Sequence, residues 1–340
     1  MIIYSFPKIV NEILESLPKN DYPVLNTQLF VSYWLGFTLD KSLTSMRDLF
    51  KRLNNTGYEC DISTFSKANL HRSQTPFIEI YQKLNQIINQ KKQNGSFKNY
   101  IICPIDSTII TLTSKLLWVL GYHQVKLFSS LNLVTGTPED NLIIFGQGHD
   151  YKHGSPIMSN LPDNGVGVMD RGFAGLKFIQ QLSDENKFFV LRISNSWKLE
   201  FDEQTGLVKV GTSKNSGLYR VVNFCDVETK TEYRLVTNLP FDDEAQVSNG
   251  EVMEIYKCRW GVELLWKFLK MHLKLDRLIT KNVNGITIQI YACLIAYLIV
   301  QLIDIPKQWG NKLIDKIRYL QACMNKEISY IHWMQNIMLC

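Results

Sequence analysis

Apolar residues repeat with helical spacing over residues 1–96 and with strand-like spacing from Tyr100 onward. In the first region they recur every three or four positions, which predicts helices. LTSMRDLFKRL and ISTFSKANLHR flank a break at NNTGYECD, so we expect two short helices around a turn. Such a pair suits a helix-turn-helix whose basic side chains meet phosphates, although helix pairs with basic exteriors are also common elsewhere.

After Tyr100 the runs NYIICPIDSTIITL, HQVKLFSSLNLVTG and NLIIFGQG predict successive β-strands separated by turn residues. The stretch GVGVMDRGFAGLKFIQQLSDENKFFVLRIS then predicts a strand, a tight turn, a helix and a strand. Hydrophobic runs on both sides of a helix indicate a sheet covered by helices. Only short strand patterns lie between Trp197 and Pro240, and a helix follows from about Ser248, so an all-β insertion is expected.

These patterns divide the chain into five segments of an α/β protein. We expect a helical N-terminal domain (1–96), a mixed sheet with flanking helices (97–196), a β-rich insertion (197–246), the rest of the sheet domain with the helix after Ser248 (247–305), and a helical C-terminal segment (306–340). The run ITIQIYACLIAYLIVQLI at 286–303 is nearly long enough to span a bilayer. Because Gln289 and Gln301 interrupt it, we interpret it as a buried helix rather than a membrane span.

Composition favours a globular intracellular protein. The 340 residues are 45% hydrophobic and 20% charged, which allows a full core. The seven cysteines are odd in number, scattered and without a C-x-x-C pair, which argues against a disulfide framework or a zinc knuckle. Residues 1–17 lack the features of an export signal, so we expect a reducing cytoplasm. The formal net charge is only +5, so any nucleic-acid surface must be local.

One narrow stripe of a predicted helix carries the most chemistry. Tyr256, Arg259, Glu263 and Lys270 follow one another at spacings of 3, 4 and 7, which places them on one helix face. A carboxylate flanked by two cations and a phenol suits a phosphate-binding surface with an acid inside it. The alternative is a solvated face with an ordinary (i, i+4) ion pair between Arg259 and Glu263.

Two further carboxylates stand at strand positions. Asp106 lies within the first predicted strand, and Asp170 lies where a later strand meets a Gly-containing turn. Acids at strand ends face the same crevice of an open sheet. Together with Glu263 they can hold two Mg²⁺ or Mn²⁺ ions about 3.5–4 Å apart, as in phosphodiester chemistry. Each Asp taken singly is more often a cap or a turn former.

The combination of I-D-S-T at 105–108, D-R-G-F at 170–173 and Y-x2-R-x3-E-x6-K from Tyr256 to Lys270 resembles bacterial insertion-sequence transposases of the DDE type. The resemblance covers about residues 100–305 and implies a ribonuclease-H-like core with a β-rich insertion before the Glu helix. The helix pair with its basic side chains leads us to expect that residues 1–96 form a DNA-binding domain.

By this resemblance Asp106, Asp170 and Glu263 are the catalytic metal ligands, with two Mg²⁺ or Mn²⁺ ions per site. Companion residues hold phosphates of the transposon end; these are Tyr256, Arg259 and Lys270. The implied reaction is hydrolysis at each inverted repeat, followed by attack of the freed 3′-hydroxyls on target DNA. The expected partners are double-stranded DNA and a second copy in a synaptic homodimer, with no membrane, in the nucleoid-associated cytoplasm.

Other residues have competing interpretations. Arg192, on the strand after Asp170, is a further candidate for DNA contact, and Trp197 and Phe241 could hold a flipped base or pack in the core. We expect Trp260 and Trp266 to be packing residues. His149, Asp150 and His153 form H-D-x-x-H, which on a helix would suggest zinc, but the neighbouring glycines favour a surface loop.

Three other functions remain as alternatives to a transposase. A metal-dependent nuclease with the same core would cut DNA without joining it. A catalytically inactive relic would bind DNA only, although all three acids are present. A structural or membrane-surface protein built around residues 286–303 would depend on detergent for solubility.

Overall fold

The computed structural model describes residues 8–54, 60–92, 97–211, 216–226, 230–241 and 247–323. The chain forms two compact units that alternate along the sequence. Unit 1 contains Met1–Ile88, Thr111–His123 and Lys267–Cys340, and unit 2 contains Asn89–Ile110 and Gln124–Trp266. The helical segments predicted at the two ends of the chain therefore contribute to the same unit.

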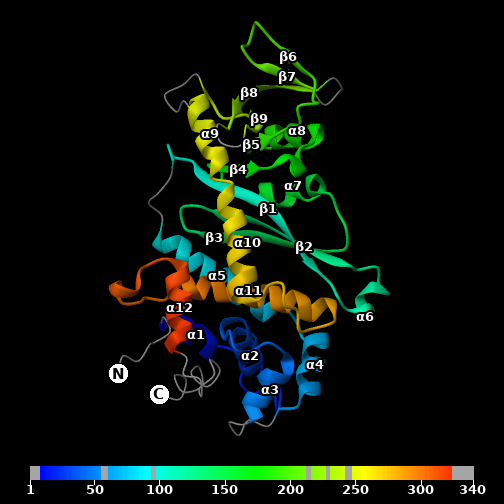
Figure 1. The fold of residues 1–340 in the computed structure, drawn as a ribbon, viewed down its shortest axis with the longest axis vertical. Helices are drawn as coiled ribbons and strands as arrows, with labels where there is room; N and C mark the ends of the chain where they lie inside the picture. Colours follow the sequence, from blue (N-terminus) through cyan, green and yellow to red (C-terminus); the bar gives the residue numbers. More distant parts are fainter. Residues whose placement is uncertain are drawn as a thin grey trace. The chain divides into compact units, whose positions relative to one another are not determined.

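Unit 2 is built on one sheet, whose described strands lie in the order β3-β2-β1-β4-β5-β9-β8-β7-β6 (Figure 1). The strands are β1 (Ile101–Thr111), β2 (Gln124–Asn132), β3 (Thr137–Phe145), β4 (Gly165–Met169), β5 (Phe188–Arg192), β6 (Leu199–Phe201), β7 (Val208–Val210), β8 (Gly217–Cys225) and β9 (Glu232–Thr237). β4 runs parallel to β1 and to β5, whereas β9 runs antiparallel to β5 and β8. This mixed sheet confirms the α/β class.

Helices cover both faces of the sheet, because side chains of the central strands alternate between two hydrophobic clusters. Cys103 and Ile105 of β1 belong to one cluster, which also contains side chains from α7 (Gly154–Ser159) and α8 (Leu176–Asp184). Ile102 belongs to the other cluster, together with side chains from α9 (Asn249–Lys257).

The segment after Trp197 contains strands and no helix in its described part up to Phe241. Its strands continue the sheet beyond β5. The backbone of β9 places Thr237 opposite Val190, and β8 places Arg220 opposite the same Thr237. Antiparallel hairpins need only short connections, so β6 to β9 extend one edge without a covering helix between them.

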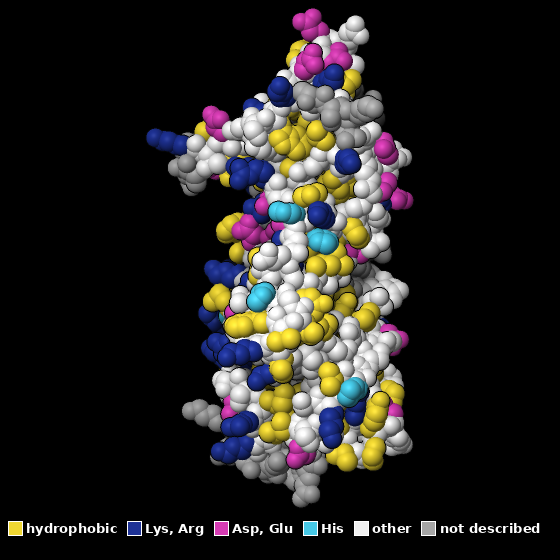
Figure 2. Space-filling view, turned by 90° about the vertical axis from the view of Figure 1, so that its right-hand side faces the viewer, with side chains coloured by type: hydrophobic (Ala, Val, Ile, Leu, Met, Phe, Trp, Pro, Cys, Tyr) yellow, Lys and Arg dark blue, Asp and Glu magenta, His cyan; other side chains and the backbone are white. Residues whose placement is uncertain are grey.

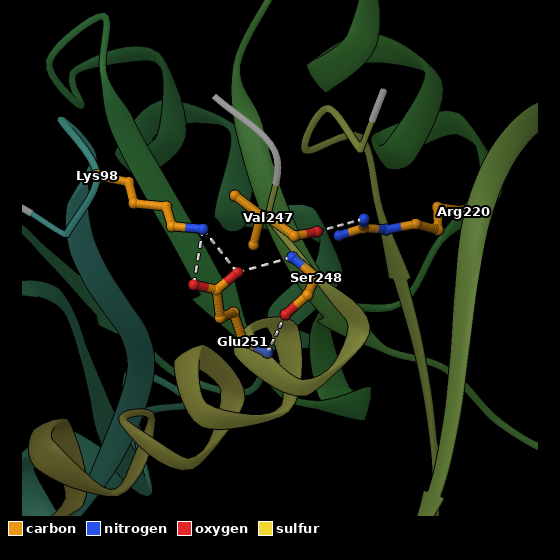
Figure 3. A network of polar contacts seen from close by, with 5 residues as sticks. All are labelled: Lys98, Arg220, Val247, Ser248 and Glu251. Atoms are coloured by element: carbon orange, nitrogen blue, oxygen red, sulfur yellow. Dashed lines mark hydrogen bonds and ion pairs between the residues drawn. The ribbon is translucent and has the colours of Figure 1, made fainter. Parts of the chain in front are cut away.

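The start of α9 is fixed by a capping box and an ion pair, drawn in Figure 3. The Ser248 hydroxyl accepts a hydrogen bond from the Glu251 backbone N–H (3.2 Å), and the Glu251 carboxylate accepts one from the Ser248 N–H (2.8 Å). Lys98 lies 2.7 Å from the same carboxylate, and this hydrogen bond is the main cause that lowers the pKa of Glu251 to about 2. The arrangement fixes the start of α9, the helix that leads toward Arg259 and Glu263.

Unit 1 is helical and carries its own core. Its helices are α1 (Lys8–Glu15), α2 (Thr27–Leu39), α3 (Met46–Asn54), α4 (Ile62–His71), α5 (Thr75–Lys91), α6 (Lys115–Trp118), α11 (Val283–Leu302) and α12 (Leu313–Cys323), and it shares α10 (Trp260–Leu273) with unit 2. Every residue of α2 is buried, and its Phe30 ring meets the Phe65 ring of α4 edge to face, with the ring centroids 5.5 Å apart. Trp34 donates a hydrogen bond from Nε1 to Asn69 (3.0 Å), which satisfies the one polar group of its ring.

The apolar run at 286–303 forms most of α11, as predicted. This helix is long and apolar enough to cross a bilayer, but 83% of its most apolar 18-residue stretch is buried inside the protein. It packs against α2 and α4 within unit 1. A helix that is hydrophobic on all sides is typical of the core of a large unit.

Both helices of the predicted helix pair exist as α3 and α4. Residues 55–59 of the intervening break lie outside the described residues. Arg72, one of the basic residues considered for phosphate contact, packs its guanidinium over the Tyr22 ring at 3.7 Å. That cation–π contact holds Arg72 within unit 1.

Candidate active site

Asp106 and Asp170 lie on neighbouring parallel strands of unit 2. β1 and β4 pair Pro104 with Val168, and the same register continued two residues farther brings Asp106 level with Asp170. Asp170 follows directly after β4 and caps a 3₁₀ turn, η2 (Arg171–Phe173), because its carboxylate accepts a hydrogen bond from the Gly172 N–H at 2.8 Å. Adjacent parallel strands thus bring the two acids together.

Glu263 lies in the first turn of α10, and its carboxylate is held by Arg259. Arg259 Nη2 lies 2.6 Å from Glu263 Oε1, and both side chains are partly buried. The (i, i+4) pair predicted from the spacing therefore forms. It is not the exposed solvated pair of the alternative interpretation, since only 19% of the Arg259 side chain is exposed.

The helix that carries the stripe is interrupted, contrary to the single helix expected. α9 ends at Lys257 and α10 begins at Trp260, because the N–H groups of Arg259, Gly261 and Val262 bond three residues back instead of four. Gly261 sits in this tightened turn, where a Cβ would lie 3.1 Å from Leu133. Close approach of Leu133, from the β2–β3 connection, therefore favours glycine at this position.

Tyr256 and Arg192 stand beside Arg259. The Tyr256 ring is 5% exposed, packs against Tyr233 and lies 5.8 Å from the Arg259 guanidinium. Burial raises the pKa of Tyr256, and the positive charges of Arg259 and Arg192 oppose that rise. Arg192 itself packs over the Tyr233 ring at 4.3 Å. Two of the predicted cations thus lie against two aromatic rings that contact each other.

Asp170 and Glu263 act electrostatically on Asp106. The pKa of Asp106 is raised to about 7, mainly by burial and in addition by the charges of Asp170 and Glu263. A backbone hydrogen bond from Ser107 and the charge of Arg259 act in the opposite direction. A carboxylate that resists ionisation among two others marks a place where a cation would be stabilised.

The carboxylates are gathered but do not converge on one point. Among the described residues, no three His, Cys, Asp or Glu side chains are placed to hold a common metal ion. One oxygen of the Glu263 carboxylate is instead paired with Arg259. The donor set consists of carboxylate oxygens and fits Mg²⁺ or Mn²⁺ better than zinc.

Lys270 lies on α10, seven residues after Glu263 and beyond the boundary between the two units. It is partly buried. Its place on the same helix agrees with the sequence spacing.

An ion pair beside the acids was missed by the sequence reasoning. Lys126 Nζ of β2 lies 2.6 Å from Asp150, which also accepts a hydrogen bond from the Ser107 hydroxyl at 3.2 Å. A Cβ on Gly172 would lie 3.0 Å from both the Asp150 and the Asp170 carboxylates. The available signal was the lysine in QVKLFSSLN, because a charge inside an otherwise buried strand needs a partner.

The tryptophan predictions have mixed outcomes. Trp266 is buried with 5% exposed, as expected of a packing residue, and Trp197 packs against the first hydrophobic cluster. The packing interpretation of Trp260 is wrong, because 58% of this residue is exposed. The interruption before α10 explains the error, since it ends the regular helical spacing from which the position of Trp260 was judged.

Comparison with known proteins agrees with this geometry. The family model described as a transposase DDE domain matches residues 98–299. A putative transposase for insertion sequence element IS4SA of Synechocystis sp. is 52% identical over 99% of this chain and 100% of its own length. A probable transposase for insertion sequence element IS5377 of Geobacillus stearothermophilus is 25% identical over 66% of this chain and 62% of its own length. The chain belongs to the DDE transposases of bacterial insertion sequences.

Proposed function

We propose that this transposase binds the terminal inverted repeats of its element, hydrolyses a phosphodiester bond at each end and joins the 3′-hydroxyls to target DNA. Unit 2 would supply a ribonuclease-H-like catalytic core, with β6 to β9 as the family's β-rich insertion. The observation that carries the proposal is that Asp106 on β1 and Asp170 directly after β4 lie level on neighbouring parallel strands, and that Asp170 and Glu263, in the first turn of α10, both act electrostatically on Asp106.

Asp106, Asp170 and Glu263 would hold two Mg²⁺ or Mn²⁺ ions. Bound ions would activate a water or a 3′-hydroxyl and stabilise the departing oxygen. The protein's own part is to place three carboxylates in a partly buried site and to hold phosphates next to them. Release of Glu263 from Arg259 would free both the carboxylate for a metal and the guanidinium for a phosphate.

The transposon end would be contacted by Arg259, Arg192 and Lys270. The Tyr256 ring would hold the Arg259 guanidinium in position. The basic surface this needs is local, as the small net charge requires. On the face that Figure 2 shows, Lys and Arg side chains stand among apolar and acidic ones and do not cover the whole face. We further propose that residues 1–96 bind the inverted repeats, that the active form on DNA is a homodimer, and that the protein works in the nucleoid-associated cytoplasm.

Excision from a plasmid tests the proposed function. The gene is placed in a plasmid with its native flanking DNA, and wild type is compared with Asp106→Ala. We expect wild type alone to excise and reinsert the element, because the variant loses a metal ligand in the buried site. Cleaved but never rejoined ends would instead indicate a nuclease, and binding of the flanking DNA without cleavage would indicate a DNA-binding relic.

Replacing Arg259 by Ala is expected to weaken binding of the flanking DNA and to flatten its salt dependence. Loss of one phosphate contact lowers the slope of log K against log salt by about 0.9. The measurement is fluorescence anisotropy over a salt series, with Arg259→Lys as the variant that keeps the charge. An unchanged slope for Arg259→Ala would show that the guanidinium serves Glu263 alone.

A further inference from the structure

The H-D-x-x-H segment has no role in the chemistry described so far, and its side chains exclude the zinc interpretation. His149 stacks on Tyr151, with ring centroids 5.9 Å apart, whereas His153 packs against Phe128 at 5.2 Å. The two imidazoles therefore have separate aromatic partners. The segment forms a short 3₁₀ turn, η1 (Asp150–Lys152), as the loop interpretation expected.

This turn is attached to β1, the strand that carries Asp106, and to its neighbour β2. Asp150 binds Lys126 of β2, and Lys126 also donates to the Gly148 carbonyl at 2.8 Å. Ser107, the neighbour of Asp106, donates to the same Asp150 carboxylate. The other Asp150 oxygen faces Gly172, across from Asp170. Partly buried, charge-assisted contacts of this kind hold a loop in one position.

The outer side of the turn is exposed and carries basic side chains. The exposed residues include His149, Tyr151 and Lys152, and 44% of Tyr151 is exposed. Lys152 Nζ lies 6.0 Å from the Tyr151 ring centroid. Arg171, also exposed, belongs to η2, which contacts η1. Asp150 is turned inward to Lys126, so its negative charge is already compensated.

We propose that the segment from Gly148 to Lys152, with Arg171, is a DNA-contact surface that holds the strand entering the catalytic acids. Lys152 and Arg171 bind its phosphates, and the stacked His149 and Tyr151 rings pack against a sugar or base of the same strand. Asp150 is a positioning residue, because it ties this surface to β1 and β2. The inference rests on the proposed role of Asp106 and Asp170 in cutting DNA.

The test measures binding of a fluorescein-labelled duplex made from the gene's flanking DNA, in EDTA, with full-length protein. Tyr151→Ala is expected to weaken binding about tenfold at every salt concentration, since one stacking contact contributes about that factor. Lys152→Ala is expected to lower the salt slope by about 0.9. Tyr151→Phe retains the ring and should bind as wild type does.

Lys177→Ala is the matched control, because Lys177 is an exposed lysine of unit 2 on α8. It should leave affinity and slope unchanged. Wild-type affinity for Tyr151→Ala together with a wild-type slope for Lys152→Ala would overturn the proposal. If wild type cuts plasmid DNA in that case, the proposed function stands and only this surface is wrong. Thermal melting checks folding, and Lys152→Ala decides the matter if Tyr151→Ala melts early.

Discussion

Glu263→Gln is expected to lose DNA cleavage and joining while keeping its affinity for DNA. The change preserves the size of the side chain but removes the charge that a metal ion needs. Losing one ligand of a catalytic ion costs several kcal/mol of transition-state stabilisation, and about 4 kcal/mol is about a thousandfold in rate. Plasmid cleavage in Mg²⁺ or Mn²⁺ measures the rate, and anisotropy in EDTA measures the affinity.

Glu254→Gln provides the matched control for this experiment. Glu254 lies on α9 and is also ion-paired, with Lys257 at 2.7 Å, but both side chains are largely exposed. An exposed pair of this kind contributes little, so the control should cut DNA at the wild-type rate. Normal cleavage by Glu263→Gln, or an equal loss in Glu254→Gln, would remove Glu263 from the set of metal ligands.

Lys274→Met is expected to produce the largest loss of stability. Lys274 is buried, follows the end of α10 and donates to the backbone carbonyls of Phe37, Asp40 and Leu43, the last at 2.6 Å. Asp40 is the C-cap of α2, where a positive charge also favours the helix dipole. Removing it leaves several buried carbonyls without this donor and should cost about 3 kcal/mol in unfolding free energy.

Urea denaturation followed by tryptophan fluorescence measures this cost. Lys267→Met is the control, because Lys267 is an exposed lysine on α10 and its loss should change the unfolding free energy by less than about 0.5 kcal/mol. Equal stability of Lys274→Met and wild type would mean that Lys274 does not hold the end of α2. DNA cleavage by the folded variant separates stability from catalysis.

The secondary structure around each acid of the site could be predicted from the residues next to it in the sequence. β-rich runs predicted the strand that contains Asp106, and GVGVMDRGF predicted a strand ending at Asp170. The spacing of Arg259 and Glu263 predicted the ion pair that the structure contains. These features depend on residues within a few positions of each other, so the spacing of apolar and charged residues in the sequence is sufficient to predict them.

Other features required contacts between distant residues. Nothing near Lys126 in the sequence indicates Asp150 as its partner, and nothing near Gly261 indicates that Leu133 packs against it. The interruption between α9 and α10 and the exposure of Trp260 were likewise not indicated by the helical spacing.

By itself, the sequence determined the α/β class, the buried nature of the 286–303 helix and the strand and helix positions of Asp106, Asp170 and Glu263, since side-chain chemistry and periodicity are local properties. Only the tertiary structure decided that β6 to β9 extend the central sheet, that helices from both ends of the chain share unit 1, and that Asp150 lies beside Asp170. Those arrangements depend on which surfaces of distant segments fit together, and hydrophobic periodicity specifies that a face is buried without specifying what covers it.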